Sequence, residues 1–380
     1  MPLQAERLAD IFVRLCEIDS PSRREGRLAA FLRGLFATEF KAEILEDASA
    51  AATGSDTGNL VVRIGGDGEL PALFFNCHLD TVEPASGVRV HRSGETFSSA
   101  GATVLGADDK AGIAMLVELA RSLKEDGAPR PPLEFVFTTC EEIGLLGAKN
   151  LDFRLIRAPG GFALDSAGID LAVIGAPASN HFTARVHGLA AHAGLHPEKG
   201  ISAIQLAARA IAELPLGRLD EESTANIGLI SGGKATNIVP ELARIDGEVR
   251  SHSPEKLARY TAAIENAFRG AVQRHNSLSV VPAGPSRPNA RLEFMVEEQF
   301  PAMRLAADAP VMARLNRAAE QLKRPLRFVV AGGGSDANIF NAQGLPTAIL
   351  GIGMTDVHTT DESITLSSMV RTAELLRALL

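Results

Sequence analysis

Histidines and acidic residues recur along this chain in short motifs that could hold metal ions. The motifs are HLDT, GADDKAG, CEEIG, ALDS and VHTTDE, with candidate ligands His78, Asp80, Asp108, Asp109, Glu141, Glu142, Asp165 and His358. Imidazole nitrogens and carboxylate oxygens suit Zn²⁺ and similar ions, and a bridging carboxylate can hold two ions about 3.5–4 Å apart. Each motif alone is a weak signal, but the ordered set predicts a two-metal hydrolytic site.

Every one of these motifs also has a purely structural interpretation. A lone HxD fits a hydrogen-bonded structural histidine, an isolated pair of glutamates fits a solvated surface, and GADDKAG fits a helix cap with acids favoured by the helix dipole. Asp165 and His358 would each be unremarkable in a loop. The apolar run LEFVFTTC argues against a surface position for Glu141 and Glu142, which follow it directly.

In two of the motifs, residues close in sequence can have different roles. Residues two apart in a strand point the same way, so Asp80 can orient the imidazole of His78. Neighbouring residues point to opposite sides, so one of Glu141 and Glu142 can bind metal while the other holds the attacking water as general base.

The elements that must position these residues alternate between helix and strand. The first segment predicts an amphipathic helix with Leu8, Ile11, Phe12 and Leu15 on one face, and a second helix through Leu35. Strand-like runs follow as NLVVRI, ALFFNCHLD, LEFVFTTCEE and GFAL, with the helical run AGIAMLVELARSL among them. Strands that are apolar on both faces predict an α/β fold with a mostly parallel sheet flanked by helices. Functional residues collect past the carboxyl ends of such strands.

The pattern changes after about Ala176. The segments HFTARVHGLA, 201–214, TANIGLI, ARIDGEVR, 254–275 and RLEFMVEEQF form a β-α-β-β-α-β series. The first pattern then resumes with RFVVAGGGSDANIF and PTAILGIG. We therefore predict a catalytic domain over residues 1–177 and 301–380, interrupted by a smaller α/β lid and dimerisation domain over residues 178–300.

Composition sets the cellular context. Over 380 residues the chain is 46% hydrophobic and 22% charged, with a formal net charge of −8. No long Lys/Arg run is present, so we expect neither nucleic acid nor a membrane as partner. Three cysteines do not suggest a disulfide framework, and the charged N-terminal residues do not resemble a signal peptide. These features predict a cytoplasmic protein.

The whole motif series resembles a known family. HxDT, GADDKAG, EEIG, ALDS, GGGSDAN and VHTTDE occur here in the order found in the co-catalytic zinc metallopeptidases that include peptidase T, carboxypeptidase G, acetylornithine deacetylase and the aminoacylases. The resemblance covers essentially the whole chain. GADDKAG and GGGSDANIF look most like the peptidase T branch. The fold that it implies is of the zinc-exopeptidase type.

Carried over residue by residue, the resemblance implies a complete ligand set. His78 and Asp165 would be the terminal ligands of one ion, Glu142 and His358 those of the other, and Asp108 would bridge both. We expect two divalent ions, Zn²⁺ first, with Mn²⁺ or Co²⁺ as alternatives.

The resemblance also assigns the catalytic groups. Asp80 would orient His78, and Glu141 would act as general base toward a water activated by the metals. The peptide bond between Asp108 and Asp109 is expected to be cis, as in relatives.

The inserted segment matches the family as well. HGLAAHAGLHPEKG resembles the lid segment in which a histidine, here His192, stabilises the oxyanion, in many relatives from the partner subunit. SGGKATNIVP and EVR supply Asn237 and Arg250 for binding substrate, and Gly333 in GGGSDANIF could present its N–H to a substrate carboxylate. A homodimer through the lid domain follows from the resemblance.

The predicted function is a metal-dependent exopeptidase of the peptidase T type, which hydrolyses the N-terminal peptide bond of short peptides, tripeptides above all. An N-acyl amino-acid deacylase or a carboxypeptidase of the same family is the alternative. A non-catalytic peptide-binding protein on the same fold is an alternative of another class.

Overall fold

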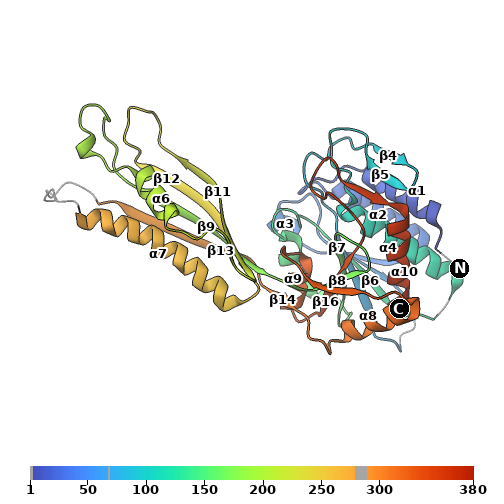
Figure 1. The fold of residues 1–380 in the computed structure, drawn as a ribbon. Coiled ribbons are helices and arrows are strands. Elements are labelled where there is room, and N and C mark those ends of the chain that lie inside the picture. Colours follow the sequence, from blue (N-terminus) through green and yellow to red (C-terminus); the bar gives the residue numbers. More distant parts are fainter. Residues whose placement is uncertain (1–2, 67–68, 128, 279–288) are drawn as a thin grey trace. The chain divides into compact units, whose positions relative to one another are not determined.

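The chain divides into two compact units, one of which is inserted into the sequence of the other. A computed structural model describes residues 3–66, 69–127, 129–278 and 289–380. Met1–Ala176 and Met303–Leu380 make up the large unit, and Pro177–Ala302 makes up the inserted unit (Figure 1). The boundaries predicted from sequence, after residues 177 and 300, lie within two residues of these. Whether the inserted unit acts as a lid or a dimer surface stays a prediction.

The large unit is built on a nine-stranded sheet. Its path runs β1-β2-β6-β3-β7-β16-β8-β14, with β15 beside β8. The strands are β1 (Glu43–Glu46), β2 (Leu60–Ile64), β3 (Leu73–His78), β6 (Leu133–Thr138), β7 (Gly161–Ser166), β8 (Leu171–Ala176), β14 (Met303–Arg304), β15 (Arg327–Val330) and β16 (Thr347–Gly351). The central strands β6, β3, β7 and β16 are parallel, and antiparallel strands complete both edges. The predicted mostly parallel sheet is confirmed.

Helices cover both faces of this sheet, and its central strands β3, β6 and β16 are buried along their whole length. One face packs against α1 (Ala5–Cys16), α2 (Gly26–Phe40), α4 (Ala107–Asp126), α8 (Pro310–Leu322) and α10 (Leu366–Ala378). The other face packs against α9 (Asp336–Ala342) and the 3₁₀ turn Phe153–Leu155, with the short helices α3 (Ala50–Thr53) and α5 (Leu146–Lys149) nearby. Phe74 and Phe75 point to opposite faces, with ring contacts to Phe340 and Phe162 respectively.

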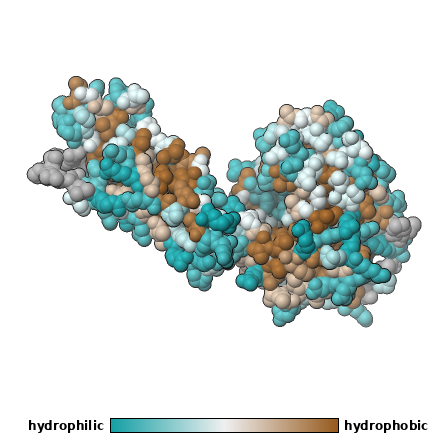
Figure 2. Space-filling model, in the orientation of Figure 1, coloured by the Kyte–Doolittle hydropathy of each residue, from teal (hydrophilic) through white to brown (hydrophobic). Residues whose placement is uncertain are grey.

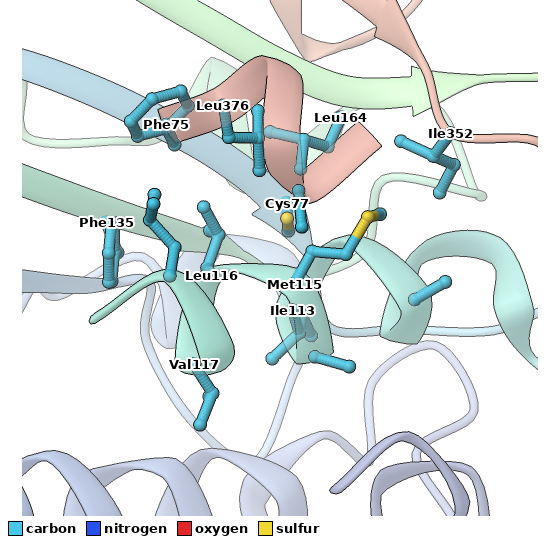
Figure 3. Close-up of a cluster of buried hydrophobic side chains, with 14 of the residues drawn as sticks. Phe75, Cys77, Ile113, Met115, Leu116, Val117, Phe135, Leu164, Ile352 and Leu376 are labelled. Atoms are coloured by element: carbon cyan, nitrogen blue, oxygen red, sulfur yellow. The ribbon is translucent and has the colours of Figure 1, made fainter. Parts of the chain in front are cut away.

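Helix α4 is the central element of the larger core. Most of its residues are buried, because the helix lies between the sheet and α1 and α10. Figure 3 shows its Met115 and Leu116 beside Phe75 and Cys77 of β3 and Leu164 of β7. This packing fixes the start of α4, which carries two of the candidate ligands.

A small second sheet belongs to the large unit. It joins β4 (Val90–Ser93), β5 (Thr96–Ser99) and β17 (Ser363–Thr365) in the order β17-β5-β4. The sequence pattern did not reveal these strands, because they are short and mostly polar. They tie the segment just after the VHTTDE motif to a hairpin from the first part of the chain.

The inserted unit is an antiparallel sheet with helices on one face. The strand order is β10-β11-β12-β9-β13, from β9 (Ala178–His187), β10 (Gly217–Asp220), β11 (Ser223–Gly232), β12 (Leu242–Ser251) and β13 (Arg291–Phe300). The helices α6 (Ala203–Ala212) and α7 (Pro254–Leu278) pack against it, and the 3₁₀ turn Pro197–Lys199 precedes α6 (Figure 1). The predicted series lacked only β10, a four-residue strand without a hydrophobic period. Among the described residues of the chain, no helix is both long and apolar enough to span a bilayer.

Candidate metal centre

The candidate ligands of the large unit come from the ends of neighbouring strands. His78 is the last residue of β3 and pairs in register with Thr138, the last residue of β6. Glu141 and Glu142 follow β6 in a turn, and Asp165 lies near the end of β7. Because these strands are parallel neighbours, their carboxyl ends meet at one edge of the sheet.

Asp108 and His358 reach the same edge from other elements. Asp108 lies in the first turn of α4, two residues after Gly106, whose φ of +78° is favourable only for glycine. The Asp108–Asp109 peptide bond is cis, as expected. His358 lies in the turn between β16 and β17 and has a φ of +64°.

Four of the predicted ligands are in direct contact. The Nε2 atom of His78 lies 3.0 Å from one carboxylate oxygen of Asp108, and the Nε2 atom of His358 lies 3.3 Å from the other. His358 Nε2 also lies 3.1 Å from Glu142. Potential ligand atoms of His78, Asp108 and Glu142 all lie within 4.8 Å of one another. Asp108 therefore stands between the two imidazoles.

Asp165 and Glu141 belong to the same electrostatic cluster. Burial first, and then the charge of Asp108, raises the pKa of Asp165 to about 8, although Ser335 donates a hydrogen bond to its carboxylate. Burial and the charge of Asp165 raise the pKa of Glu141 well above its ordinary value. Both carboxyl groups therefore lack a nearby cation strong enough to offset burial.

The two histidines also have raised pKa values, but the cause is contact with carboxylates and not burial. Burial opposes a charged His78, but its contacts with Asp108 and Asp80 raise its pKa overall. Hydrogen bonds to Asp108 and Glu142 raise the pKa of His358 to about 10. For Asp108 itself, burial is outweighed by hydrogen bonds with His358 and His78, which lower its pKa.

This donor set fits divalent metal ions. Two imidazole nitrogens face a group of buried carboxylates, and Glu142 Oε1 is buried without a hydrogen-bond partner. An orphaned carboxylate oxygen beside nitrogen ligands is a favourable position for a hard or borderline cation. Asp109 is turned elsewhere, since its Oδ2 accepts the main-chain N–H of His78 at 3.2 Å.

Asp80 contacts His78 mainly through its main chain. The Nδ1 atom of His78 lies 2.9 Å from the carbonyl oxygen of Asp80 and 3.5 Å from its carboxylate. The carboxylate instead accepts the main-chain N–H groups of Glu141, at 2.9 Å, and Glu142, at 3.2 Å. Asp80 thus connects the HLDT and CEEIG motifs.

Two further acids at this edge escaped the sequence reasoning. Glu362 is buried and accepts the main-chain N–H groups of Gly106, at 2.7 Å, and Asp108, at 2.9 Å. Asp336 is buried and accepts a hydrogen bond from Thr138, and burial raises its pKa to about 6. Both lie inside motifs already quoted, VHTTDE and GGGSDAN, so the signal was present but was assigned to other residues of those motifs.

The predicted substrate-binding residues lie partly in the inserted unit. His192 is exposed and forms a bridge with Ile238, next to Asn237, whose carbonyl accepts the N–H of Ala193. Arg250 lies on β12 and forms an ion pair with Glu248. Gly333 belongs to the large unit, in an exposed loop before α9.

Comparison with known proteins shows which family this chain resembles in sequence and fold. The model of peptidase family M20/M25/M40 matches residues 74–380. The crystal structure of aminopeptidase PepT from Bacillus cereus is 38% identical, covers 99% of this chain and 98% of its own, and has a TM-score of 0.89. A tripeptidase from Staphylococcus aureus is 33% identical, with coverage of 100% and 98% and a TM-score of 0.92. The uncharacterised protein YqjE of Bacillus subtilis is 36% identical over 99% of this chain and 98% of its own length.

The pKa shifts predict that the metal-free protein loses stability as pH rises. The folded-state pKa of Asp165, about 8, exceeds its ordinary 3.8, so its contribution to stability is lost as pH rises from 3.8 through 8. The folded-state pKa of His358, about 10, exceeds 6.5, so its contribution is lost between those values. The two pH ranges overlap between 6.5 and 8, and the Tm of chelator-treated protein should decrease over this overlap. Saturating Zn²⁺ should weaken this dependence, and Asp165→Asn should remove part of it. A Tm that rises over this range would contradict the assignment.

Proposed function

Since the chain belongs to peptidase family M20/M25/M40, we propose that it is a two-metal aminopeptidase that releases the N-terminal residue of short peptides, tripeptides above all. The family makes it a metal-dependent peptidase. The choice of aminopeptidase activity is supported by the similarity to aminopeptidase PepT and to a tripeptidase, each above 30% identity over nearly the whole chain.

One observation carries the catalytic part of the proposal. Glu141, a buried acid with a raised pKa, lies in the same electrostatic cluster as His78, Glu142 and Asp165. A carboxylate with a raised pKa is a stronger base than an exposed one and can exchange protons near neutral pH. Its neighbour Glu142 contacts His358 directly. Burial raises the pKa of both adjacent glutamates, and the contact with His358 is what distinguishes Glu142 as the proposed ligand.

In this proposal the ligand assignment is the one that the family resemblance implies, and the contacts of Asp108 with both imidazoles support it. His78 and Asp165 would hold one divalent ion, Glu142 and His358 would hold the other, and Asp108 would serve both. Bound divalent ions would polarise the scissile carbonyl and acidify a water molecule. Zn²⁺ is the ion we expect, with Mn²⁺ or Co²⁺ as alternatives.

Glu141 performs the proton transfers. It accepts a proton from the attacking water, and the water oxygen adds to the peptide carbonyl carbon. Glu141 then delivers that proton to the nitrogen of the leaving amine, and the C–N bond breaks. Asp80 orients both a proposed metal ligand and the proposed base, because its carbonyl contacts His78 and its carboxylate accepts the N–H of Glu141.

His192 is proposed to donate to the developing oxyanion. Its Nδ1 atom accepts the main-chain N–H groups of Gly194 and Leu195, each at 3.2 Å. A ring nitrogen that accepts hydrogen bonds carries no proton, so in the neutral ring the proton lies on Nε2. His192 is therefore prepared as a donor through Nε2. Asn237, Arg250 and Gly333 are proposed to bind the polar groups of the substrate.

We also propose a homodimer through the inserted unit. Most of the exposed large apolar side chains among the described residues lie there, and Figure 2 shows apolar surface on this unit. They are Leu195, Ile204, Leu216, Leu229, Ile230, Ile238, Leu242, Met295 and Val296. Exposed apolar side chains that gather in this way are typical of an interaction surface.

The three cysteines are free and buried, which supports the prediction of a cytoplasmic protein.

A release assay tests the substrate class. Chelator-treated protein should be inactive, and Zn²⁺, Mn²⁺ or Co²⁺ should restore release of the N-terminal amino acid from tripeptides, measured by chromatography. Dipeptides and N-acetyl and N-succinyl amino acids should be poorer substrates. Preferred release of an acyl group or of a C-terminal residue would favour the deacylase or carboxypeptidase alternative. No hydrolysis by the metal-loaded protein would favour a peptide-binding protein without catalysis.

Substitution of the two glutamates separates base from ligand. Glu141→Gln keeps the shape but removes the proton acceptor, so kcat should fall by about 10²–10⁴ while two ions per chain remain bound. Glu142→Gln should instead lower the metal content, measured by elemental analysis. If the two phenotypes are exchanged, the roles of the pair are reversed.

Substitution of His192 tests the oxyanion donor and its origin. His192→Ala should lower kcat by roughly 10²–10³ with little change in KM or metal content, as for loss of one donor. If the histidine acts across the dimer, mixing His192→Ala with Glu141→Gln subunits should restore some activity, because one site of a hybrid has both groups. No recovery despite proven subunit exchange would place His192 in its own chain's site or outside catalysis.

A further inference from the structure

The turn that carries Glu141 is held by two buried carboxylates outside its own segment. The N–H groups of three successive residues, Cys140, Glu141 and Glu142, all point to these acids. Glu25 accepts the N–H of Cys140 at 2.9 Å, and Asp80 accepts the other two. We call this arrangement, Glu25 and Asp80 on the N–H groups of residues 140–142, the carboxylate clamp.

The clamp acts on a strained part of the backbone. Cys140 has a φ of +53°, in the left-handed region that residues with a Cβ rarely adopt. Such a conformation persists only where surrounding contacts determine it. Cys140 makes two contacts with Glu25, one from its main-chain N–H and one from its Sγ atom at 3.3 Å.

Glu25 is buried in the large unit, and several hydrogen bonds hold its carboxylate in place. Its side chain has no exposed surface, although it lies at the start of α2. The carboxylate accepts hydrogen bonds from Ser55 and from the main chain of Arg23 as well as from Cys140. A buried carboxylate with several donors is firmly oriented, because each donor would be left unpaired if it moved.

The segment around Glu25 also holds the other half of the clamp. Ser22 donates to Asp80 at 2.7 Å, and Ser20 donates to the carbonyl of Leu79 at 2.8 Å. The N–H of Thr81 in turn donates to the carbonyl of Ser20 at 3.0 Å. One turn of chain, 20–25, thus fastens the loop after β3 and the loop after β6 together.

We propose that Glu25 is a positioning residue for the general base: it fixes the backbone of Cys140 so that Glu141 faces the reaction. This inference rests on the proposed function, in which Glu141 is the base. Displacement of a reacting group by about 1 Å can cost roughly 10²-fold in rate, so loss of the clamp should appear in kcat. Metal binding should change little, because the ligand Glu142 keeps its N–H contact with Asp80 and its contact with His358 when Glu25 is replaced, and substrate binding uses other groups.

Two variants of Glu25 separate hydrogen bonding from size. Glu25→Ala removes every acceptor from Cys140. Glu25→Gln keeps one oxygen for the N–H of Cys140, and its amide can donate to the hydroxyl of Ser55, which reorients. We therefore expect Glu25→Ala to lower kcat by about 10–100-fold with KM changed by less than about 3-fold. Glu25→Gln should retain most of the wild-type kcat.

Glu118 provides the matched control. It is equally buried, on α4, and its carboxylate binds Arg7 and the main-chain N–H of Gln4, far in the sequence from residues 140–142. Glu118→Ala should lower the Tm yet leave kcat unchanged at temperatures well below that Tm. A loss of kcat in this control as large as in Glu25→Ala would show that any buried acid has the same effect and would overturn the proposal.

A double-mutant cycle tests whether Glu25 acts through Glu141. In the Glu141→Gln background the base is absent, so Glu25→Ala should lower the remaining rate by less than about 2-fold. If Glu25→Ala lowers it as strongly as in the wild type, Glu25 does not act through Glu141. Elemental analysis should find two ions in Glu25→Ala, and loss of an ion would likewise contradict the positioning role.

The experiment uses metal-loaded full-length protein and a tripeptide that the wild type hydrolyses. If the wild type hydrolyses none, the proposed function has failed, independently of the clamp. If Glu25→Ala does not fold, Glu25→Asp replaces it, since the shorter side chain withdraws the carboxylate from Cys140 while keeping the charge. An unchanged kcat in a folded Glu25→Ala or Glu25→Asp variant overturns the proposal.

Discussion

The constraint on which this structure depends is the burial of many carboxylates at one edge of a sheet. Asp80, Asp108, Glu141, Asp336 and Glu362 are all buried there. Like charges in a medium of low polarity repel and lose hydration, so the cluster is tolerated only where cations or N–H donors face it. The raised pKa values of Asp165 and Glu141 and the lowered pKa of Asp108 show which members have such partners within the protein and which do not.

The buried acids form two layers that differ in their hydrogen-bond partners. The inner layer, which includes Asp108 and Glu142, contacts imidazole nitrogens. The outer layer, Glu25, Asp80 and Glu362, accepts main-chain N–H groups of the loops that carry the inner layer. A carboxylate that accepts two or more N–H groups fixes the path of a loop through strong, directional hydrogen bonds. The outer acids thereby determine where the inner acids point.

The parallel topology explains why distant motifs can share one site. His78, Glu141 and Asp165 follow or end three neighbouring strands, and α4 begins at the same edge because its apolar residues pack against those strands. His192, Asn237 and Arg250, by contrast, belong to the inserted unit.

The sequence by itself determined the fold class and membership of a family of metal-dependent peptidases. Apolar runs of strand length, each followed by acids or histidine, indicated a parallel sheet with a metal site at its carboxyl edge, because strand burial and ligand type are local properties of residues. Only the tertiary structure decided how Asp80 divides its carbonyl and carboxylate between His78 and Glu141, and that Glu25 and Glu362 hold the loops. Apart from the contact between Asp80 and His78, which are two positions apart, these contacts join residues 61 to 256 positions apart. No local pattern encodes them, since a buried glutamate and a solvated one look alike until the chain has folded around them.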